Sequence, residues 1–227
     1  MLDKLELITT SDGSHSLLNT ELNETYHSVH GAIQESINVF LKNGLDYFEQ
    51  SSNQPEIRIL EVGFGTGLNA LLTLQHSLYG STKIRYESLE AFPIEQEIVS
   101  LLNYSKTLNF SGSEKYFMQL HHSTWNQQVE IASNFSLVKR HAKIQDVELG
   151  DGKFDVIYFD AFAPSKQPEM WELSILKKIE RSMKSGAVFV TYCAKGQLKR
   201  DLKSLGLLVE TLPGPPGKKE MVRAVKP

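Results

Sequence analysis

Residues 61–69 read EVGFGTGLN, and this stretch decides how the chain around it folds. Its three glycines follow the apolar run IRILEV at residues 57–62 and precede the apolar run LNALLTLQHSL at residues 68–78. Short apolar runs on either side of a glycine loop indicate a buried strand, a tight turn and a helix. Because glycine has no side chain, the turn can also bring its backbone close to a ligand.

The spacing of the glycines separates the possible ligands. A dinucleotide loop needs its third glycine at the position of Leu68, and a phosphate-binding P-loop needs a lysine that is missing here. The segment from Glu61 to Gly67 instead gives E-x-G-x-G-x-G, the pattern of S-adenosylmethionine (SAM) methyltransferases. SAM carries an ammonium and a sulfonium, so an acid before the loop is favourable. The expected cofactor contacts are therefore Glu61, Gly63, Phe64, Gly65 and Gly67.

Strands and helices alternate after residue 56, which predicts an α/β fold. Together with the glycine motif, this order resembles the Rossmann-like class I SAM-dependent methyltransferase fold. A mostly parallel sheet, with helices on both faces, should end in an antiparallel pair of strands around PGPPGKK at residues 213–219. The predicted strands are 57–62, 83–91, 135–142, 154–160 and 187–193, followed by the pair 207–212 and 220–225; the predicted helices are 68–78, from Pro93 to about residue 103, 168–183 and 196–206.

Residues 1–50 are expected to form a small extension packed on a main domain of residues 51–227. Asp12-Gly13 indicates a hairpin turn. The apolar spacing in residues 31–48 predicts an amphipathic helix despite Gly44, and this helix should cover the edge of the main fold. Residues 104–134 show no clear pattern.

Further acidic residues are expected near the cofactor. Glu90 ends the second predicted strand, where an acid would bind the ribose hydroxyls. Glu87 is the alternative, but it lies inside the strand and can face the other way. Asp146 follows the third strand and could reach the adenine amino group.

The stretch FDVIYFDAFAPSKQPEMW at residues 154–171 carries the second motif. An apolar strand ends in Asp160, and Phe162 and Pro164 follow, which resembles the Asp/Asn-Pro-Pro-aromatic signature of amino-group methyltransferases. Two simpler interpretations remain open: Asp160 could cap a turn, and Trp171 could belong to the core.

Composition narrows the class of protein. The net charge of −3 hides a balance of +5 in residues 151–227, whose lysines and arginines could face phosphates or could form ordinary solvated helix faces. The chain has one cysteine, Cys193, and no Cys/His cluster with zinc spacing, so no metal site is expected. We expect a cytoplasmic protein, because no run approaches the ~20 apolar residues of a membrane span.

Four segments together resemble the methyltransferase domain of the MnmC family, which modifies the wobble uridine of tRNA: HGAIQES at residues 30–36, GFGTGLN at 63–69, DAFAPSKQPEMW at 160–171 and GKKEMVRAV at 217–225. The resemblance runs over most of residues 5–226 and is weakest at 104–150. It implies SAM-dependent methylation of the aminomethyl group at carbon 5 of (2-thio)uridine 34, giving S-adenosylhomocysteine as the second product.

The same resemblance implies roles for individual residues. Asn69 would join the glycine loop in holding SAM, Glu35 would close over the same pocket, and Asp160 would bind the reacting amine. The family's flavin oxidase domain has no counterpart here, so a separate oxidoreductase is expected to supply the aminomethyl substrate.

The tRNA anticodon stem-loop is the expected partner. The wobble base could stack on Phe162 or Trp171, with Pro164 beside it, and Lys166, Lys218 and Lys219 are placed to meet phosphates. Three alternatives stay open: a methyltransferase for a small amine, an NAD-linked oxidoreductase, which Leu68 disfavours, and a non-catalytic RNA-binding module, which would not bind SAM.

Overall fold

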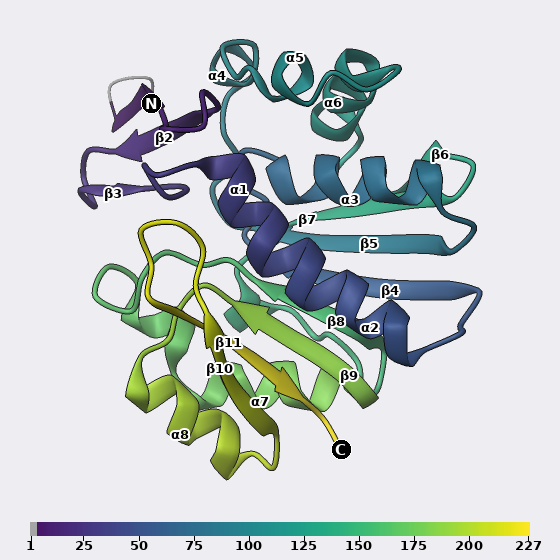
Figure 1. Ribbon diagram of the computed structural model, residues 1–227, viewed down its shortest axis with the longest axis vertical. Helices are drawn as coiled ribbons and strands as arrows, with labels where there is room; N and C mark the ends of the chain where they lie inside the picture. Colours follow the sequence, from purple (N-terminus) through teal and green to yellow (C-terminus); the bar gives the residue numbers. More distant parts are fainter. Residues whose placement is uncertain (1–3) are drawn as a thin grey trace.

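An eight-stranded sheet runs through the centre of the protein, whose computed structural model describes residues 4–227 (Figure 1). Five neighbouring strands are parallel, in the order β9-β8-β4-β5-β7, and antiparallel strands extend both edges. The strands are β4 (Glu56–Val62), β5 (Lys83–Glu90), β6 (Gln128–Ala132), β7 (Phe135–His141), β8 (Phe154–Phe159), β9 (Met183–Thr191), β10 (Leu208–Pro213) and β11 (Glu220–Val225). The predicted α/β class, the five parallel strands and the C-terminal antiparallel pair are confirmed.

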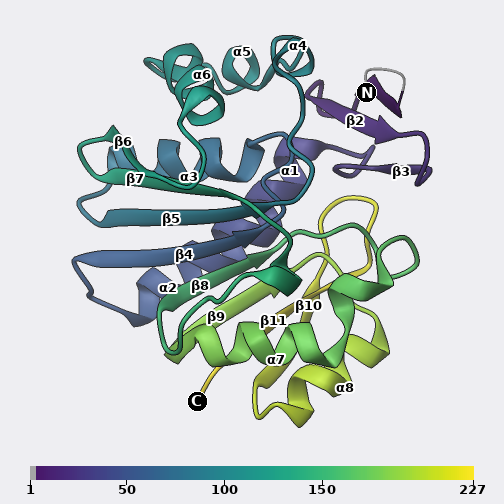
Figure 2. The same cartoon turned by 180° about the vertical axis from the view of Figure 1, so that it is seen from behind.

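Helices cover both faces of this sheet (Figures 1 and 2). One face carries α1 (Ala32–Ser36), the π-helical η2 (Ile37–Leu45), α2 (Asp46–Ser51) and α3 (Leu68–Tyr79); the other carries α7 (Leu173–Ser182) and α8 (Gly196–Ser204). Alternate residues of each strand enter two separate hydrophobic cores: Ile57 and Ile59 of β4 pack on the first face, and Leu60 and Val62 on the second. Strand β8 is buried throughout, as expected for a central parallel strand.

The helix predicted in residues 31–48 exists, but its predicted position is wrong. The continuous run α1–η2–α2 crosses the face of the sheet over β8, β9 and β11 instead of covering an edge. Gly44 allows this close approach, because a Cβ atom there would lie 3.0 Å from Val190 Cγ2 and 3.2 Å from Tyr158 Cε1. A residue that counts against the helix in isolation is thus required by its packing on the sheet.

The predicted N-terminal hairpin is confirmed as β1 (Leu5–Thr9) paired with β2 (His15–Asn19), and a short β3 (Glu24–Thr25) completes a small separate sheet. Asp12 holds its turn, since its carboxylate accepts hydrogen bonds from the Ser14 and Gln34 backbone N–H groups at 3.0 Å each. The domain boundary at residue 50 stays a prediction. Phe40 and Leu45, which precede it, share one core with the sheet.

The segment between β5 and β7 departs most from the sequence prediction. No helix starts at Pro93; α4 is limited to Gln96–Val99, because Glu90 holds the preceding turn by accepting a hydrogen bond from the Phe92 N–H at 2.8 Å. Helices α5 (Tyr104–Leu108) and α6 (Ser113–His122) follow. The predicted helix 168–183 is also divided, into the 3-10 turn η4 (Pro168–Trp171) and α7. No helix within residues 4–227 is long and apolar enough to cross a bilayer.

A charged group ties α2 to α3 on the outside of the first helical layer. His76 lies 2.9 Å from Glu49 and 3.6 Å from Asp46, and the three potential ligand atoms lie within 4.8 Å of one another. The hydrogen bond to Glu49 raises the pKa of His76. Because each ring nitrogen of His76 faces a carboxylate oxygen, we interpret this group as an ion-pair cluster.

We expect Gly44→Val to lower the free energy of unfolding by roughly 1–3 kcal/mol, because two added methyl groups have no room against Val190 and Tyr158. Lys42→Val, on the exposed side of the same helix, is the matched control and should cost well under that. Urea unfolding followed by circular dichroism measures both. Equal losses for the two variants would mean that helix propensity, and not the contact with the sheet, sets the cost.

Candidate active site at the carboxyl ends of the parallel strands

A cleft of about 1440 Å³ opens where β4, β5, β7 and β8 end. The strand order reverses between β4 and β8, because β5 and β7 lie on one side of β4 and the later strands β8 and β9 lie on the other. Open α/β sheets bind ligands at such a switch point. The N-terminal extension and the loop between β10 and β11 close the far side of the cleft (Figure 1). The cleft exceeds the roughly 300–1,000 Å³ of ordinary small-molecule pockets, so it has room for a cofactor and part of a second molecule.

The glycine loop forms one wall of the cleft, and Gly63 sets its path. Gly63 has φ 97°, and a Cβ atom there would lie 2.6 Å from the carbonyl oxygen of Asp160. The Gly63 N–H donates to the Leu89 carbonyl at 2.9 Å, which fixes the loop against the end of β5. Gly65 also lines the cleft, and Gly67 precedes the first residue of α3. Phe64 and Thr66 also line the cleft, whereas Gly67 does not, so the backbone of Gly63 and Gly65 forms only part of this wall.

Two residues of the motif lie deeper than expected. Glu61 is fully buried beneath the loop, does not line the cleft and accepts a hydrogen bond from the Ser88 hydroxyl at 2.6 Å. Burial raises the pKa of Glu61 to about 8, so the predicted ionic contact with the cofactor is not supported. Phe64 touches the cleft, but its ring is buried and packs edge-on against His121 and Trp125.

The expected ribose and adenine residues both line the cleft. Glu90 lies at the end of β5, and its two oxygens accept hydrogen bonds from the Gly65 N–H at 2.9 Å and the Phe92 N–H at 2.8 Å. Glu87 does not line the cleft and pairs with Arg140 and Lys153. Asp146 is exposed at the end of the 3-10 turn η3 (Ile144–Asp146), after β7.

Asp160 and Asn69 meet across the cleft floor. The Asn69 amide donates to a carboxylate oxygen of Asp160 at 2.8 Å, and both residues line the cleft. Burial, with a smaller contribution from the negative charge of Glu35, raises the pKa of Asp160 to about 7, against the opposing effects of Asn69 and Lys218. A carboxyl group with a pKa near neutrality suits proton transfer.

The aromatic residues of the second motif have different positions. Phe162 lines the cleft and meets the ring of Tyr26 edge-on at 5.0 Å. Trp171 lies behind it, is buried against Phe159 and donates its indole N–H to the Phe162 carbonyl at 2.8 Å. The predicted stacking of a base on Trp171 is therefore wrong, because the ring belongs to the core and holds the Phe162 segment. Pro164 does not line the cleft either.

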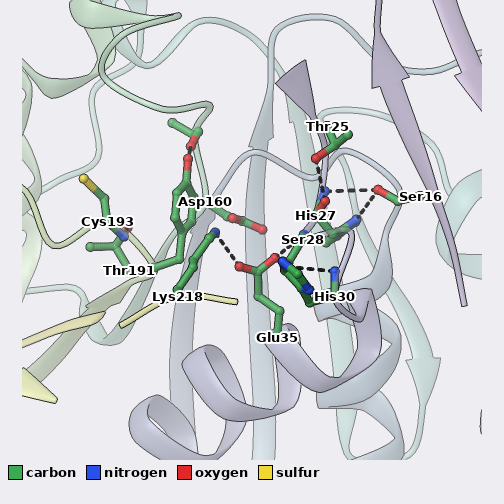
Figure 3. Close-up of polar contacts among 12 residues, drawn as sticks. Ser16, Thr25, His27, Ser28, His30, Glu35, Asp160, Thr191, Cys193 and Lys218 are labelled. Atoms are coloured by element: carbon green, nitrogen blue, oxygen red, sulfur yellow. Dashed lines mark hydrogen bonds and ion pairs between the residues drawn. The ribbon is translucent and has the colours of Figure 1, made fainter. Parts of the chain in front are cut away.

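The three lysines expected to contact phosphates lie in different environments. Lys166 lines the cleft, and Lys219 is exposed outside it. Lys218 points inward to the carboxylate of Glu35 (Figure 3). Much of the basic C-terminal run is neutralised by acids of the same chain, which weakens the prediction of a broad phosphate-facing surface: the pairs are Lys184–Asp155, Lys199–Glu220, Arg223–Glu210 and Lys226–Glu180.

Two tyrosines of the cleft were not among the predicted residues. Tyr192 directly follows β9, and its hydroxyl donates to the Ala161 carbonyl at 2.8 Å. Its position at the end of a predicted parallel strand was the signal that could have identified it. Tyr26 lies in the N-terminal extension, where no pattern in the sequence pointed to the cleft.

Comparisons with known proteins show which family the chain is similar to. A sequence model of the S-adenosyl-L-methionine-dependent methyltransferase family matches residues 112–227. The chain is 30% identical over 217 residues to the tRNA 5-methylaminomethyl-2-thiouridine biosynthesis bifunctional protein MnmC of Leptospira interrogans, and 31% identical over 229 residues to the protein of that name from Pseudoalteromonas atlantica.

These alignments cover 90% and 91% of the chain but 33% and 31% of the two relatives, so the chain spans about a third of their length. Among solved structures, MnmC2 from Aquifex aeolicus is 26% identical and superposes with a TM-score of 0.79, covering 98% of this chain and 71% of that one.

We expect Asp160→Asn to raise the melting temperature at pH 8. The pKa of Asp160 is about 7 in the folded protein against an ordinary 3.8, so the folded state binds the proton more tightly. Stability should therefore fall as pH rises from about 4 to about 7, and stay reduced above that. Asparagine removes this cost, so the variant should melt a few degrees higher than the wild type at pH 8, and the two should converge near pH 4.

Asp151→Asn is the control, because Asp151 is a surface acid whose pair with Arg181 is exposed. Its melting temperature should follow that of the wild type across the whole pH range. Thermal unfolding at fixed ionic strength measures all three proteins. An Asp160→Asn variant that melts below the wild type at pH 8 would show that the carboxylate is stabilising.

Proposed function

The chain belongs to the S-adenosyl-L-methionine-dependent methyltransferase family, and we propose that it methylates the aminomethyl group at carbon 5 of the wobble (2-thio)uridine of tRNA. The observation that carries this proposal is the Asp160–Asn69 pair beside the glycine loop. It places a carboxylate of near-neutral pKa next to the expected methyl donor, where an amine acceptor needs a group that orients it and takes up its proton.

The cleft fits SAM by the chemistry of its walls. Gly63 and Gly65 both line it, and the absence of a lysine in the loop suits a cofactor without phosphates. We assign the ribose hydroxyls to Glu90, the adenine amino group to Asp146 and the amino-acid end to Asn69 and the glycine loop. Glu61 supports the loop from below through Ser88.

Held by the glycine loop, Asn69, Glu90 and Asp146, SAM would supply an electrophilic methyl group for the acceptor nitrogen, with S-adenosylhomocysteine as the second product. The chain's residues orient that nitrogen and remove its proton. Asn69 fixes the Asp160 carboxylate by its hydrogen bond, and Asp160 accepts the proton. Holding the reacting atoms in line supplies much of the acceleration, since fixed geometry is worth ~7–11 kcal/mol.

Recognition of tRNA is the finer part of the proposal. It is supported by the relatives' names and by the size of the cleft, which leaves room beside the cofactor. A base drawn out of its stack could lie against Phe162 and Tyr26, whose rings meet at the cleft, and Lys166 and Lys219 could contact anticodon phosphates. We further propose a cytoplasmic location and a separate oxidoreductase that supplies the aminomethyl group.

The substrate can be tested by incubating the protein with labelled SAM and tRNA that carries 5-aminomethyl-2-thiouridine, followed by nucleoside mass spectrometry. We expect a gain of one methyl group on that nucleoside, and none on tRNA that lacks the aminomethyl group. The free nucleoside should react at least 100-fold more slowly, because it lacks the phosphate contacts. Equal rates on nucleoside and tRNA would point to a small-amine methyltransferase instead, and failure to bind SAM would exclude both activities.

The role of Asp160 can be tested separately. Asp160→Asn should lower kcat by about 10²–10⁴-fold, the usual contribution of a general acid or base, while the Kd for SAM changes by less than about threefold. Asp146→Asn is the matched comparison and should mainly raise the Kd for SAM. Calorimetry and single-turnover kinetics separate the two effects. Equal losses of turnover and SAM affinity in Asp160→Asn would assign Asp160 to cofactor binding.

A further inference from the structure

A primary ammonium group of the protein itself already lies beside the proposed acceptor site. The Lys218 Nζ atom pairs with the carboxylate of Glu35 and lies 3.6 Å from the centre of the Tyr192 ring. Glu35, Asp160 and Lys218 point toward one another in Figure 3, from α1, the end of β8 and the loop before β11. All of these residues, Tyr192 included, line the cleft.

The groups around this ammonium are held by the fold. One oxygen of Glu35 accepts a hydrogen bond from the Ser28 N–H at 2.6 Å, which leaves the other oxygen for the cation. The Tyr192 hydroxyl is anchored to the Ala161 carbonyl, next to Asp160, so the ring face stays turned to the cleft. A carboxylate and an aromatic face around one nitrogen form a site for an alkylammonium ion.

We propose that Glu35, Asp160 and Tyr192 form the receptor for the acceptor's primary ammonium, and that Lys218 fills this receptor as an internal surrogate until the acceptor displaces it. This inference rests on the proposed transfer to a primary amine. An aminomethyl group and the end of a lysine side chain are the same chemical group, a CH₂–NH₃⁺, so a site built for one accepts the other.

The burial of Glu35 explains why a surrogate is needed. Its side chain is 6% exposed, and a carboxylate so buried is costly without a cation beside it. The Lys218 side chain is 31% exposed, and its ammonium is attached through four flexible carbons. The ammonium can therefore withdraw toward solvent without unfolding the loop. The exchange replaces one ammonium with another, so the Glu35 carboxylate keeps a cation beside it until a proton of the acceptor is removed. The acceptor nitrogen thereby arrives beside Asp160, which takes up its proton.

Once displaced from Glu35, the Lys218 ammonium can pair with a phosphate of an RNA substrate. Lys166 also lines the cleft, and Lys219 is exposed next to Lys218 in the chain, so an RNA phosphate at the cleft would meet several cations. An RNA substrate therefore offers both parts of the exchange, an ammonium for Glu35 and a phosphate for Lys218. A small free amine offers only the first part and has to compete with Lys218 unaided.

The test uses propylammonium as the probe and needs no RNA. The full-length protein loaded with S-adenosylhomocysteine is titrated with propylammonium chloride, with sodium chloride keeping the ionic strength constant, and binding is followed by ligand-observed NMR. We compare the wild type, Lys218→Met, Lys218→Met/Glu35→Gln and the neighbouring control Lys219→Met. Melting temperatures of all four verify folding. If Lys218→Met does not fold, Lys218→Gln, which keeps a hydrogen bond to Glu35 without the charge, replaces it.

Lys218→Met should bind propylammonium at least about tenfold more tightly than the wild type, because the receptor is vacated. The added Glu35→Gln change should abolish this gain, and Lys219→Met should behave as the wild type. A Lys218→Met variant that folds but binds the probe no better than the wild type, or a gain that survives Glu35→Gln, would overturn the proposal. It would leave the Glu35–Lys218 pair as a structural link only.

A second measurement separates positioning from folding. Glu35→Gln should raise the KM for the aminomethyl tRNA by about tenfold, leave the Kd for SAM within about twofold, and be rescued in part by Glu35→Asp. A variant that instead loses SAM binding and acceptor turnover together would indicate a purely structural role. If the tRNA proves not to be the substrate, the probe titration still decides whether the receptor exists, so failure of the inference and failure of the proposed function remain distinguishable.

Discussion

The contact between Gly63 and the carbonyl of Asp160 is the constraint on which the site depends. It brings the turn after β4 and the end of β8 into backbone contact. A Cβ atom on residue 63 would lie only 2.6 Å from the Asp160 carbonyl oxygen, so this position requires glycine. The two motifs of the sequence are separated by about 90 residues, yet this approach places them side by side at the switch point of the sheet. The glycine loop and Asp160, the proposed cofactor loop and proton acceptor, are therefore held next to each other by the backbone.

Around this contact, three carboxyl groups lie at different depths below the surface of the cleft. Glu61 lies under the loop without access to the cleft, and burial raises its pKa to about 8. Asp160 lies at the cleft floor with a pKa of about 7 and retains Asn69 as a partner. Glu90 sits at the rim and accepts two backbone N–H groups. These differences agree with the different roles that we propose for the three carboxyl groups: support of the loop, proton transfer and recognition of hydroxyl groups.

The sequence was sufficient for the parts of the fold that depend on local patterns. Apolar runs followed by glycine or aspartate identified β4 and β8, and the strand-end rule placed Glu90, Asp146 and Asp160 at one edge. The prediction from local patterns failed where packing between distant segments determines the structure. From the sequence, Gly44 is a weak point in a helix until the sheet beneath it is known. Trp171 could equally stack on a base or belong to the core, and only the contact of its indole N–H with the Phe162 carbonyl decides between the two. The inward turn of Lys218 depends on Glu35, 183 residues away, and no local pattern reveals it.

That separation of 183 residues also orders the assembly of the molecule. The sheet and the glycine loop close through contacts between neighbouring βα units. The ion pair between Glu35 and Lys218 instead joins segments from opposite ends of the chain and carries a large loop-closure entropy. It should form last during folding and be the first to open under mild denaturant. A partly opened molecule would then retain the glycine loop and the end of β5 while the contact between Glu35 and Lys218 is lost, and hydrogen exchange should be fast around these two residues.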